Sequence, residues 1–243
     1  MDRWNRRAVG MRAAALVIAV GGAARYYRAM TLTTSSMLIG ARGYTHKCWQ
    51  GRFYPPDLPH EWRFLFYSHR YPALLLPARG WGGDLDRLAA FAEEAPPDFR
   101  LVLEVPERAL ASLAARGGWP QPLVAACLVR LPRLAGGHAA PLRALARRLP
   151  VSVDLRACSE ACKAELAGLG VGICGRPAAG RSPAGPFALS LVDRVDRRGL
   201  AAALRELGAV SAPAGRALFF QDATSALTGV DEALLLASLL AGS

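Results

Sequence analysis

A run of alternating polar and apolar residues, Val151–Arg156, carries charges that a β-strand would place on one face. Successive side chains of a strand point to opposite faces, so Ser152, Asp154 and Arg156 share one face and the apolar residues share the other. Charges buried in an apolar layer without partners are costly. We therefore expect the polar face of this strand to point into the interior of a closed sheet.

Glu104 and Arg130 lie near the ends of two other predicted strands and, by the same parity, point inward toward Asp154 and Arg156. One interpretation of this set is structural: the acids and guanidiniums neutralise one another and fix the interior geometry. The other is functional: Asp154 and Glu104 are the candidate catalytic residues, which transfer a proton, while Arg130 and Arg156 bind a phosphate or carboxylate.

Other side chains follow the predicted strands directly and could line the same end of the sheet, where loops vary without disturbing the packed interior. The alternative for each is a solvated loop side chain. The set comprises the ligand-binding candidates Arg42, Tyr44, Arg176 and Asp222, together with Arg79, Trp81 and Asp193.

An aromatic-rich loop follows the first predicted strand and contains His46, Trp49, Phe53 and Tyr54. These rings could cover the end of the sheet or stack on a ring-bearing ligand. The alternative, which we favour, is a small satellite core that holds the loop in place.

The sequence contains no G-x-G-x-x-G after a predicted strand, no Walker loop, no H-E-x-x-H pair and no G-x-S-x-G nucleophile elbow. Its four histidines are scattered, and Cys158 and Cys162 would need further ligands to hold a metal, so we predict neither a metal site nor a cofactor. The five cysteines have no regular spacing, which favours a reducing, cytoplasmic location over a disulfide framework.

Short apolar runs alternate with segments of helical period from Met37 onward, which is typical of repeated βα units and a parallel sheet. Eight such units predict a single-domain α/β protein with a TIM-like (β/α)₈ barrel, although an open doubly wound sheet has the same local pattern. The predicted strands are 38–41, 73–76, 100–105, 125–131, 151–155, 171–174, 187–191 and 217–221.

Helical segments are predicted after most of these strands. Between the sixth and seventh strands, residues 175–186 are rich in glycine and proline, which cannot sustain a helix interior, so a loop is expected there. The predicted helices are 61–69, 84–94, 107–115, 139–148, 159–168, 197–207 and 230–240.

Residues 1–36 are predicted to be an extension outside the barrel domain, which covers residues 37–243. The extension has a basic start and a short apolar run, residues 13–24, which also fits a secretory signal; the run is too short to span a membrane. The formal net charge of +11 favours an anionic partner, but six arginines of the extension supply about half of it. The barrel domain is therefore only moderately basic.

The run Leu38–Pro59, LIGARGYTHKCWQGRFYPPDLP, resembles the opening of the YecE-like family, in which a strand and a Gly-aromatic turn precede a Trp and Gly-x-Phe-Tyr-Pro. Later segments agree in order, so the resemblance covers roughly residues 37–240. It implies a bacterial, cytoplasmic TIM-like barrel whose biochemical activity is not established.

The chain departs from the family pattern where that barrel would open. Leu74–Pro77 replaces a Val-Glu-Ile-Asn segment, Glu104 replaces a Lys, and Ala157 replaces a His. Ser190 and Val192 stand in place of an Arg and a His, and Gln221 and Asp222 in place of paired Asn. The resemblance thus implies the scaffold of the family without its polar residues.

These observations leave three function classes, and whether the protein is an enzyme stays open. The first is a divergent, catalytically inactive barrel that binds a small anionic or phosphorylated ligand, or a partner, at the carboxyl end of its strands. The second is a hydrolase or lyase acting on a phosphorylated or nucleotide-like substrate. Nucleic-acid binding is third and has the least support, because basic residues are not clustered in the barrel domain. No membrane span is expected, and the oligomeric state stays open.

Overall fold

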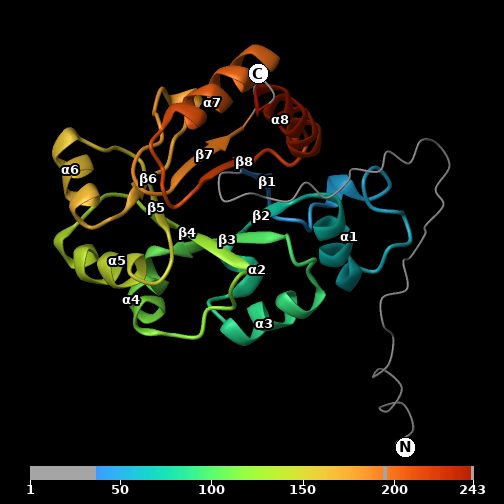
Figure 1. Cartoon of the computed structure of the whole chain (residues 1–243). Helices are drawn as coiled ribbons and strands as arrows, with labels where there is room; N and C mark the ends of the chain where they lie inside the picture. The colour runs from blue at the N-terminus through green and yellow to red at the C-terminus, as the bar shows by residue number, and fades with distance from the viewer. Residues whose placement is uncertain (1–36, 194–195, 242–243) are drawn as a thin grey trace, which may run out of the picture. The chain divides into compact units, whose positions relative to one another are not determined.

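The computed structural model describes residues 37–193 and 196–241, so the predicted extension, residues 1–36, lies outside the described residues. Eight parallel strands alternate with helices and form one sheet in the order β6-β5-β4-β3-β2-β1-β8-β7 (Figure 1). The predicted (β/α)₈ barrel is therefore confirmed. The strands are β1 Leu38–Arg42, β2 Ala73–Leu76, β3 Arg100–Pro106, β4 Val124–Leu131, β5 Val151–Leu155, β6 Gly172–Ile173, β7 Ala188–Val192 and β8 Arg216–Phe220.

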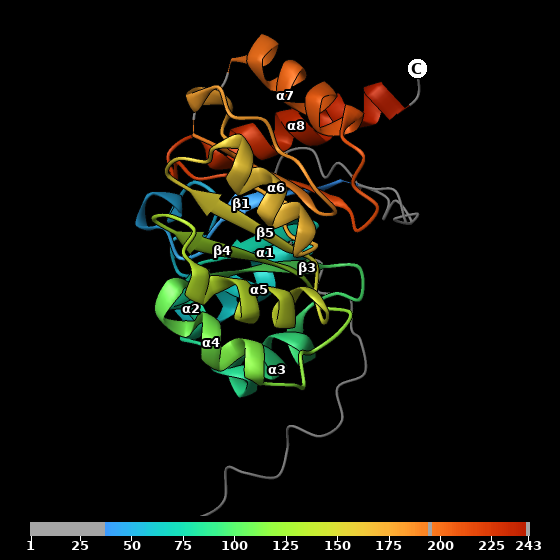
Figure 2. The ribbon, with the colours of Figure 1, turned by 90° about the vertical axis from the view of Figure 1, so that its left-hand side faces the viewer.

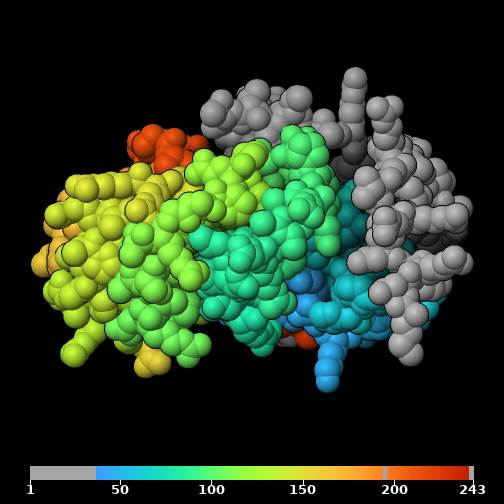
Figure 3. Space-filling model, turned by 90° about the horizontal axis from the view of Figure 1, so that it is seen from below, coloured from blue at the N-terminus to red at the C-terminus, as the bar shows by residue number. Residues whose placement is uncertain are grey.

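Helices cover the outside of the strands. Figure 2 shows α3, α4 and α5 on one side of the sheet and α7 and α8 on the opposite side. In the space-filling view, the segments that contain α3, α4 and α5 follow one another across one face of the molecule (Figure 3). The helices are α1 Arg63–Arg70, α2 Ala78–Trp81, α3 Leu85–Glu94, α4 Glu107–Ala115, α5 Ala139–Ala146, α6 Glu160–Gly168, α7 Arg197–Ala209 and α8 Ala226–Ala241.

Side-chain parity along the strands separates two apolar layers. On β2, Ala73 and Leu75 belong to a cluster inside the barrel, whereas Leu74 and Leu76 pack in the larger core between the strands and the helices. On β5, Val151 and the other apolar residues belong to the outer core, as the alternation predicts. The same parity therefore controls which polar side chains enter the barrel.

Local sequence explains where several helices begin. The carboxylate of Asp84 accepts a hydrogen bond from the backbone N–H of Asp86 at the start of α3, and Asp196 accepts one from Gly199 at the start of α7. Ser159 caps α6 in the same way. Each cap satisfies an N–H group that has no partner within its own helix.

The short helix α2 was not predicted, because four residues are too few to show helical periodicity. It ends at Gly82, whose φ of 66° lies in the left-handed region. Helix α8 starts at Ala226, four residues before the predicted start, because the carbonyl of Asp222 accepts a hydrogen bond from its first N–H group.

The segment between β6 and β7 contains no α-helix, as predicted, and has only the 3₁₀ turn Pro177–Ala179. Gly175, just after β6, joins the two ends of the sheet: its N–H donates to Leu189 O at 2.7 Å, and its carbonyl accepts from Leu191 N at 3.0 Å. A Cβ on Gly175 would lie 2.6 Å from Ser190 Oγ and 2.8 Å from the backbone nitrogen of Pro183. Closure of the barrel thus requires glycine here.

We expect Gly175→Ala to lower the free energy of unfolding by about 1–3 kcal/mol, because the added methyl overlaps backbone atoms that cannot move freely. Urea denaturation followed by circular dichroism measures this loss. Gly208→Ala is the matched control, because a Cβ there meets nothing within 4 Å and alanine favours the helix α7. Equal stability of wild type and Gly175→Ala would show that closure does not depend on this glycine.

Candidate functional site

A layer of charged side chains closes the interior of the barrel at the carboxyl ends of its strands. Arg42, Glu104, Arg130 and Asp154 each stand at or near the end of their strand and share the inward parity of the interior residues. The predicted inward direction of Glu104, Arg130 and Asp154 agrees with the ion pairs that these residues form. The layer consists of two linked clusters of ion pairs.

Glu104 is the centre of the first cluster. Its Oε1 lies 2.5 Å from Arg42 Nε, its Oε2 lies 2.8 Å from Arg42 Nη2, and Arg130 Nη2 approaches Oε1 at 2.8 Å. The side chain of Glu104 is only 4% exposed, whereas those of Arg42 and Arg130 are 29% and 34% exposed. The hydrogen bond to Glu104 raises the pKa of Arg42 above its ordinary value. The carboxylate is therefore buried beneath two guanidiniums that remain accessible.

Asp154 is the centre of the second cluster. Arg176 binds it through Nε at 3.0 Å and Nη2 at 2.5 Å, and Arg181 Nη2 lies 2.7 Å from its Oδ1. Arg181 also donates from Nη1 to the carbonyl of Leu155. The side chain of Asp154 is 9% exposed, and those of Arg176 and Arg181 are 26% and 15% exposed. The arrangement repeats that of the first cluster.

A tight turn after β6 places Arg176 and Arg181 beside Asp154. The backbones of Arg176 and Arg181 exchange two hydrogen bonds, of 2.7 and 3.1 Å. Pro177 begins the 3₁₀ turn between them, and Gly180 ends it with a φ of 62°. These turn residues hold the two arginine side chains on the same side of the loop.

The two clusters influence each other because Arg130 and Asp154 are register partners on neighbouring strands. Burial raises the pKa of Asp154, but the hydrogen bond and charge of Arg176 and the charges of Arg130 and Arg181 outweigh it, and the pKa lies below its ordinary value. Asp154 is therefore ionised at neutral pH. A strong acid of this kind is a weak proton acceptor, which argues against a role in general acid–base catalysis.

Guanidinium N–H donors outnumber the acceptors of this layer. Arg130 Nη2 also donates to Gln221 Oε1 at 3.0 Å, and Gln221 Nε2 donates to Asp193 Oδ1 at 3.1 Å, which links β4 to the ends of β7 and β8. The Nε–H groups of Arg130 and Arg181 are buried and have no acceptor among the described residues. The two acids therefore do not use all the donors of the surrounding guanidiniums.

Arg156 does not join this layer, which corrects its predicted inward direction, while its predicted part in ligand binding stays a prediction. Strand β5 ends at Leu155, and Arg156 is exposed to solvent beyond it. Alternation continues only while the backbone is extended, so parity stops predicting direction where the strand ends. Arg176 and Arg181 take the place that the sequence assigned to Arg156.

Tyr44 is buried in the outer core and does not line the end of the barrel, contrary to its predicted place. Its ring packs edge-on against Phe64 of α1 and Phe91 of α3, with centroid distances of 5.6 and 6.2 Å. Burial raises its pKa above the ordinary value. The residue follows β1 by two positions, where the chain turns outward at Gly43.

Asp222 lies at the start of α8, where its carboxylate accepts hydrogen bonds from local groups. These are the N–H and hydroxyl of Thr224 and the hydroxyl of Ser225, at 2.8–3.2 Å. This capping role accounts for the aspartate without a ligand. Its predicted part in ligand binding stays a prediction.

The aromatic loop is held in place by its own rings, as the favoured alternative expected, but these rings pack in the large core between the strands and the helices and do not form a separate satellite core. Trp49 stacks on Tyr67 with an interplanar angle of 8°, and Tyr54 OH donates to Tyr44 O at 2.6 Å. Trp49 Nε1 also donates to Ala223 O at 2.6 Å, which ties this loop to the one after β8. In α2, Arg79 is exposed, and Trp81 is buried behind Glu104, whose carbonyl accepts from Trp81 Nε1 at 3.2 Å.

Sequence reasoning missed Arg181 as a member of the charged layer. Pro177 and Gly180 between two arginines signal a turn, which could have indicated that Arg176 and Arg181 lie together. Gln221 was noted only as a departure from a family pattern, and it lies one residue beyond the end of β8, where strand parity no longer predicts direction.

Among the described residues, no group of three or more His, Cys, Asp or Glu side chains is placed to hold a metal ion. The described helices include none that is long and apolar enough to cross a bilayer. Comparison with protein-family models, with curated proteins and with solved structures finds no match to this chain. A functional assignment therefore depends on the geometry of the site.

We expect Asp154→Asn to lower the free energy of unfolding by about 3 kcal/mol at pH 7, because it leaves two arginines without their buried anion. The folded-state pKa of Asp154 is lowered, so its contribution is complete above the unfolded-state pKa, about 3.9, and is lost as pH falls through the folded-state value. The stability difference between wild type and variant should thus shrink below about pH 4.

Urea denaturation at a series of pH values measures this difference. Asp98→Asn is the matched control, because Asp98 is exposed. A difference for Asp154→Asn that stays constant down to pH 2 would contradict the proposed ion pairing.

Proposed function

We propose that the carboxyl end of the barrel binds a small oxyanion, a phosphate or carboxylate group of a ligand, through Arg42, Arg130 and Arg176. The observation that carries this proposal is the difference in exposure between the two kinds of charge. Glu104 and Asp154 are almost fully buried, whereas a quarter to a third of each of these three arginine side chains is exposed. A ligand that approaches from solvent would meet guanidiniums before carboxylates.

Arginine suits this role because its planar fork donates two parallel hydrogen bonds to a carboxylate or phosphate. Glu104 already binds the fork of Arg42 and holds it in place, and Asp154 does the same for Arg176. Side chains held in this way lose little entropy when a ligand arrives. The acids would then act as positioning residues for the arginines.

A binding function fits the site better than the alternative of a hydrolase or lyase. Both candidate catalytic acids, Glu104 and Asp154, are held in ion pairs with arginines, and the pKa of Asp154 is lowered rather than raised toward neutrality. General acid–base catalysis is most efficient when the pKa of the group lies near the working pH. The state of the two carboxylates therefore favours a role in holding the arginines in place over a role in proton transfer.

The likeness of Leu38–Pro59 to the YecE-like family stays a proposal alongside this one. The aromatic residues of that run pack in the large core between the strands and the helices, at the start of the barrel. Their packing supports the proposal that this chain has the scaffold of the YecE-like family. The charged layer at the end of the barrel consists of residues outside the aromatic set. The five free cysteines are in keeping with a reducing location.

Isothermal titration with inorganic phosphate and with citrate tests anion binding at low salt. We expect Arg130→Gln to weaken binding by about tenfold or more, because it removes one charge-assisted donor pair while Glu104 keeps Arg42 as its partner. Arg130→Lys should recover only part of the affinity, since an ammonium lacks the planar fork.

Arg205→Gln is the matched control, because Arg205 is exposed on α7 and its loss changes the net charge equally. Equal binding by all variants, or a loss in the control as large as that in Arg130→Gln, would overturn the proposal. Circular dichroism of each variant serves as the check that it is folded.

A further inference from the structure

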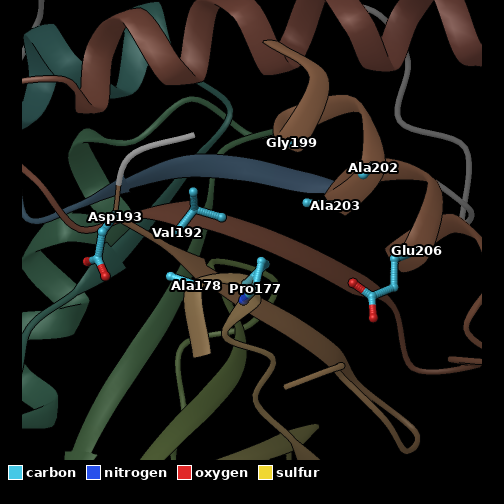
Figure 4. A pocket seen from close by; sticks show the side chains of 8 residues that line it. All are labelled: Pro177, Ala178, Val192, Asp193, Gly199, Ala202, Ala203 and Glu206. Carbon is cyan, nitrogen blue, oxygen red and sulfur yellow. The ribbon is translucent and has the colours of Figure 1, made fainter. Parts of the chain in front are cut away.

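A second site lies outside the sheet, where a helix between β6 and β7 would stand in a regular barrel. A hollow of about 520 Å³, here called the outer hollow, opens between the turn after β6 and helix α7. Pro177 and Ala178 form one wall, Val192 at the end of β7 lies at its base, and α7 forms the other wall (Figure 4). Its volume is within the range of small-ligand pockets.

The wall contributed by α7 is low because its residues are small. Gly199, Ala202 and Ala203 share one face of the helix at spacings of three and four residues, and Glu206 continues that face by one further turn. With Val192 and the two loop residues, they make an apolar trough. Methylene groups of a ligand would pack against it.

A carboxylate stands at each end of the trough, with Asp193 and Glu206 on opposite sides of the apolar residues (Figure 4). Gly199 and Glu206 lie seven positions apart on α7, which corresponds to about 10 Å along the helix. Glu206 is half-buried in the last turns of α7, where the helix dipole adds negative potential. Among the residues that the structure describes, no Lys or Arg lines the outer hollow.

A neighbouring hollow of about 340 Å³ shares Asp193 and has the same sign of charge. Its other acids, Asp196 and Glu232, have protein partners: Asp196 caps α7, and Glu232 lies 3.3 Å from Arg197. Glu206 has no ion pair or hydrogen bond among the described residues. Of the two acids of the outer hollow, Asp193 accepts a hydrogen bond from Gln221 Nε2 through its Oδ1, and Glu206 is the one left without a partner among the described residues.

We propose that the outer hollow binds a linear aliphatic diamine or polyamine, whose terminal ammonium groups pair with Asp193 and Glu206 while its methylene chain lies in the apolar trough. The apolar lining of the trough matches the methylene chain, and the carboxylates on its two sides match cations at both ends of that chain. A partner helix along α7 fits less well, since two turns of helix about 10 Å across fill roughly 800 Å³. This proposal is independent of anion binding at the barrel end.

Isothermal titration with diaminooctane, octylamine and octanediol separates the two charges from the apolar chain. Diaminooctane should bind most tightly, because only it places an ammonium group at each acid. Glu206→Gln should weaken diaminooctane binding by about tenfold, the value of one charge-assisted hydrogen bond, and bring it close to that of octylamine. Ala202→Leu should prevent binding of both amines by filling the trough.

Glu93→Gln on α3 is the matched control for a general loss of negative charge, because Glu93 is exposed and distant in sequence from the hollow. Absence of binding to the folded wild-type protein would overturn the proposal. So would equal affinity for diaminooctane and octanediol, or equal losses in Glu206→Gln and Glu93→Gln. Phosphate titration of the same samples reports the barrel end separately, so either site can fail without the other.

Discussion

The pairing of Glu104 and Asp154 with arginines is the constraint on which the carboxyl end of this barrel depends. Parity along β3 and β5 directs both acids into the interior, where an unpaired carboxylate is costly. Each acid is bound by two guanidiniums, one of them through two hydrogen bonds. Because buried ion pairs contribute little net stability, their role is better seen as fixing geometry than as stabilising the fold. The result is a rigid layer with its acids inside and its cations outermost.

One segment, the chain between β6 and β7, decides several features at once. Gly175 closes the sheet against β7, and the turn that follows brings Arg176 and Arg181 to Asp154. A regular helix in this position would cover the outer face of β7 and one side of α7. Its absence leaves the outer hollow open to solvent. The loop that completes the charged layer inside the barrel therefore also creates the acidic trough outside it.

The two proposed sites differ in charge and are joined by a short polar chain. Gln221 accepts from Arg130 on the interior side and donates to Asp193, which lines the outer hollow. On one side of this amide the accessible groups are guanidiniums, and on the other they are carboxylates. A protein of high net positive charge thus keeps a local acidic region, since its lining acids gather around α7 and the start of α8. The amide separates the two signs without burying an unpaired charge.

The sequence by itself determined the alternation of strands and helices, the loop in place of one helix, and the inward direction of Glu104, Arg130 and Asp154. These follow from periods of two and of about 3.6 residues, which are local properties of the chain. It did not determine the partners of those charges, because Arg156 has the right parity but lies beyond the end of β5, and Arg181 reaches Asp154 from a loop 27 residues away. It also placed Tyr44 at the barrel end, whereas the turn at Gly43 directs the ring into the outer core. Only the tertiary structure decides such contacts, because they depend on sheet register, on loop paths and on how α7 is left uncovered.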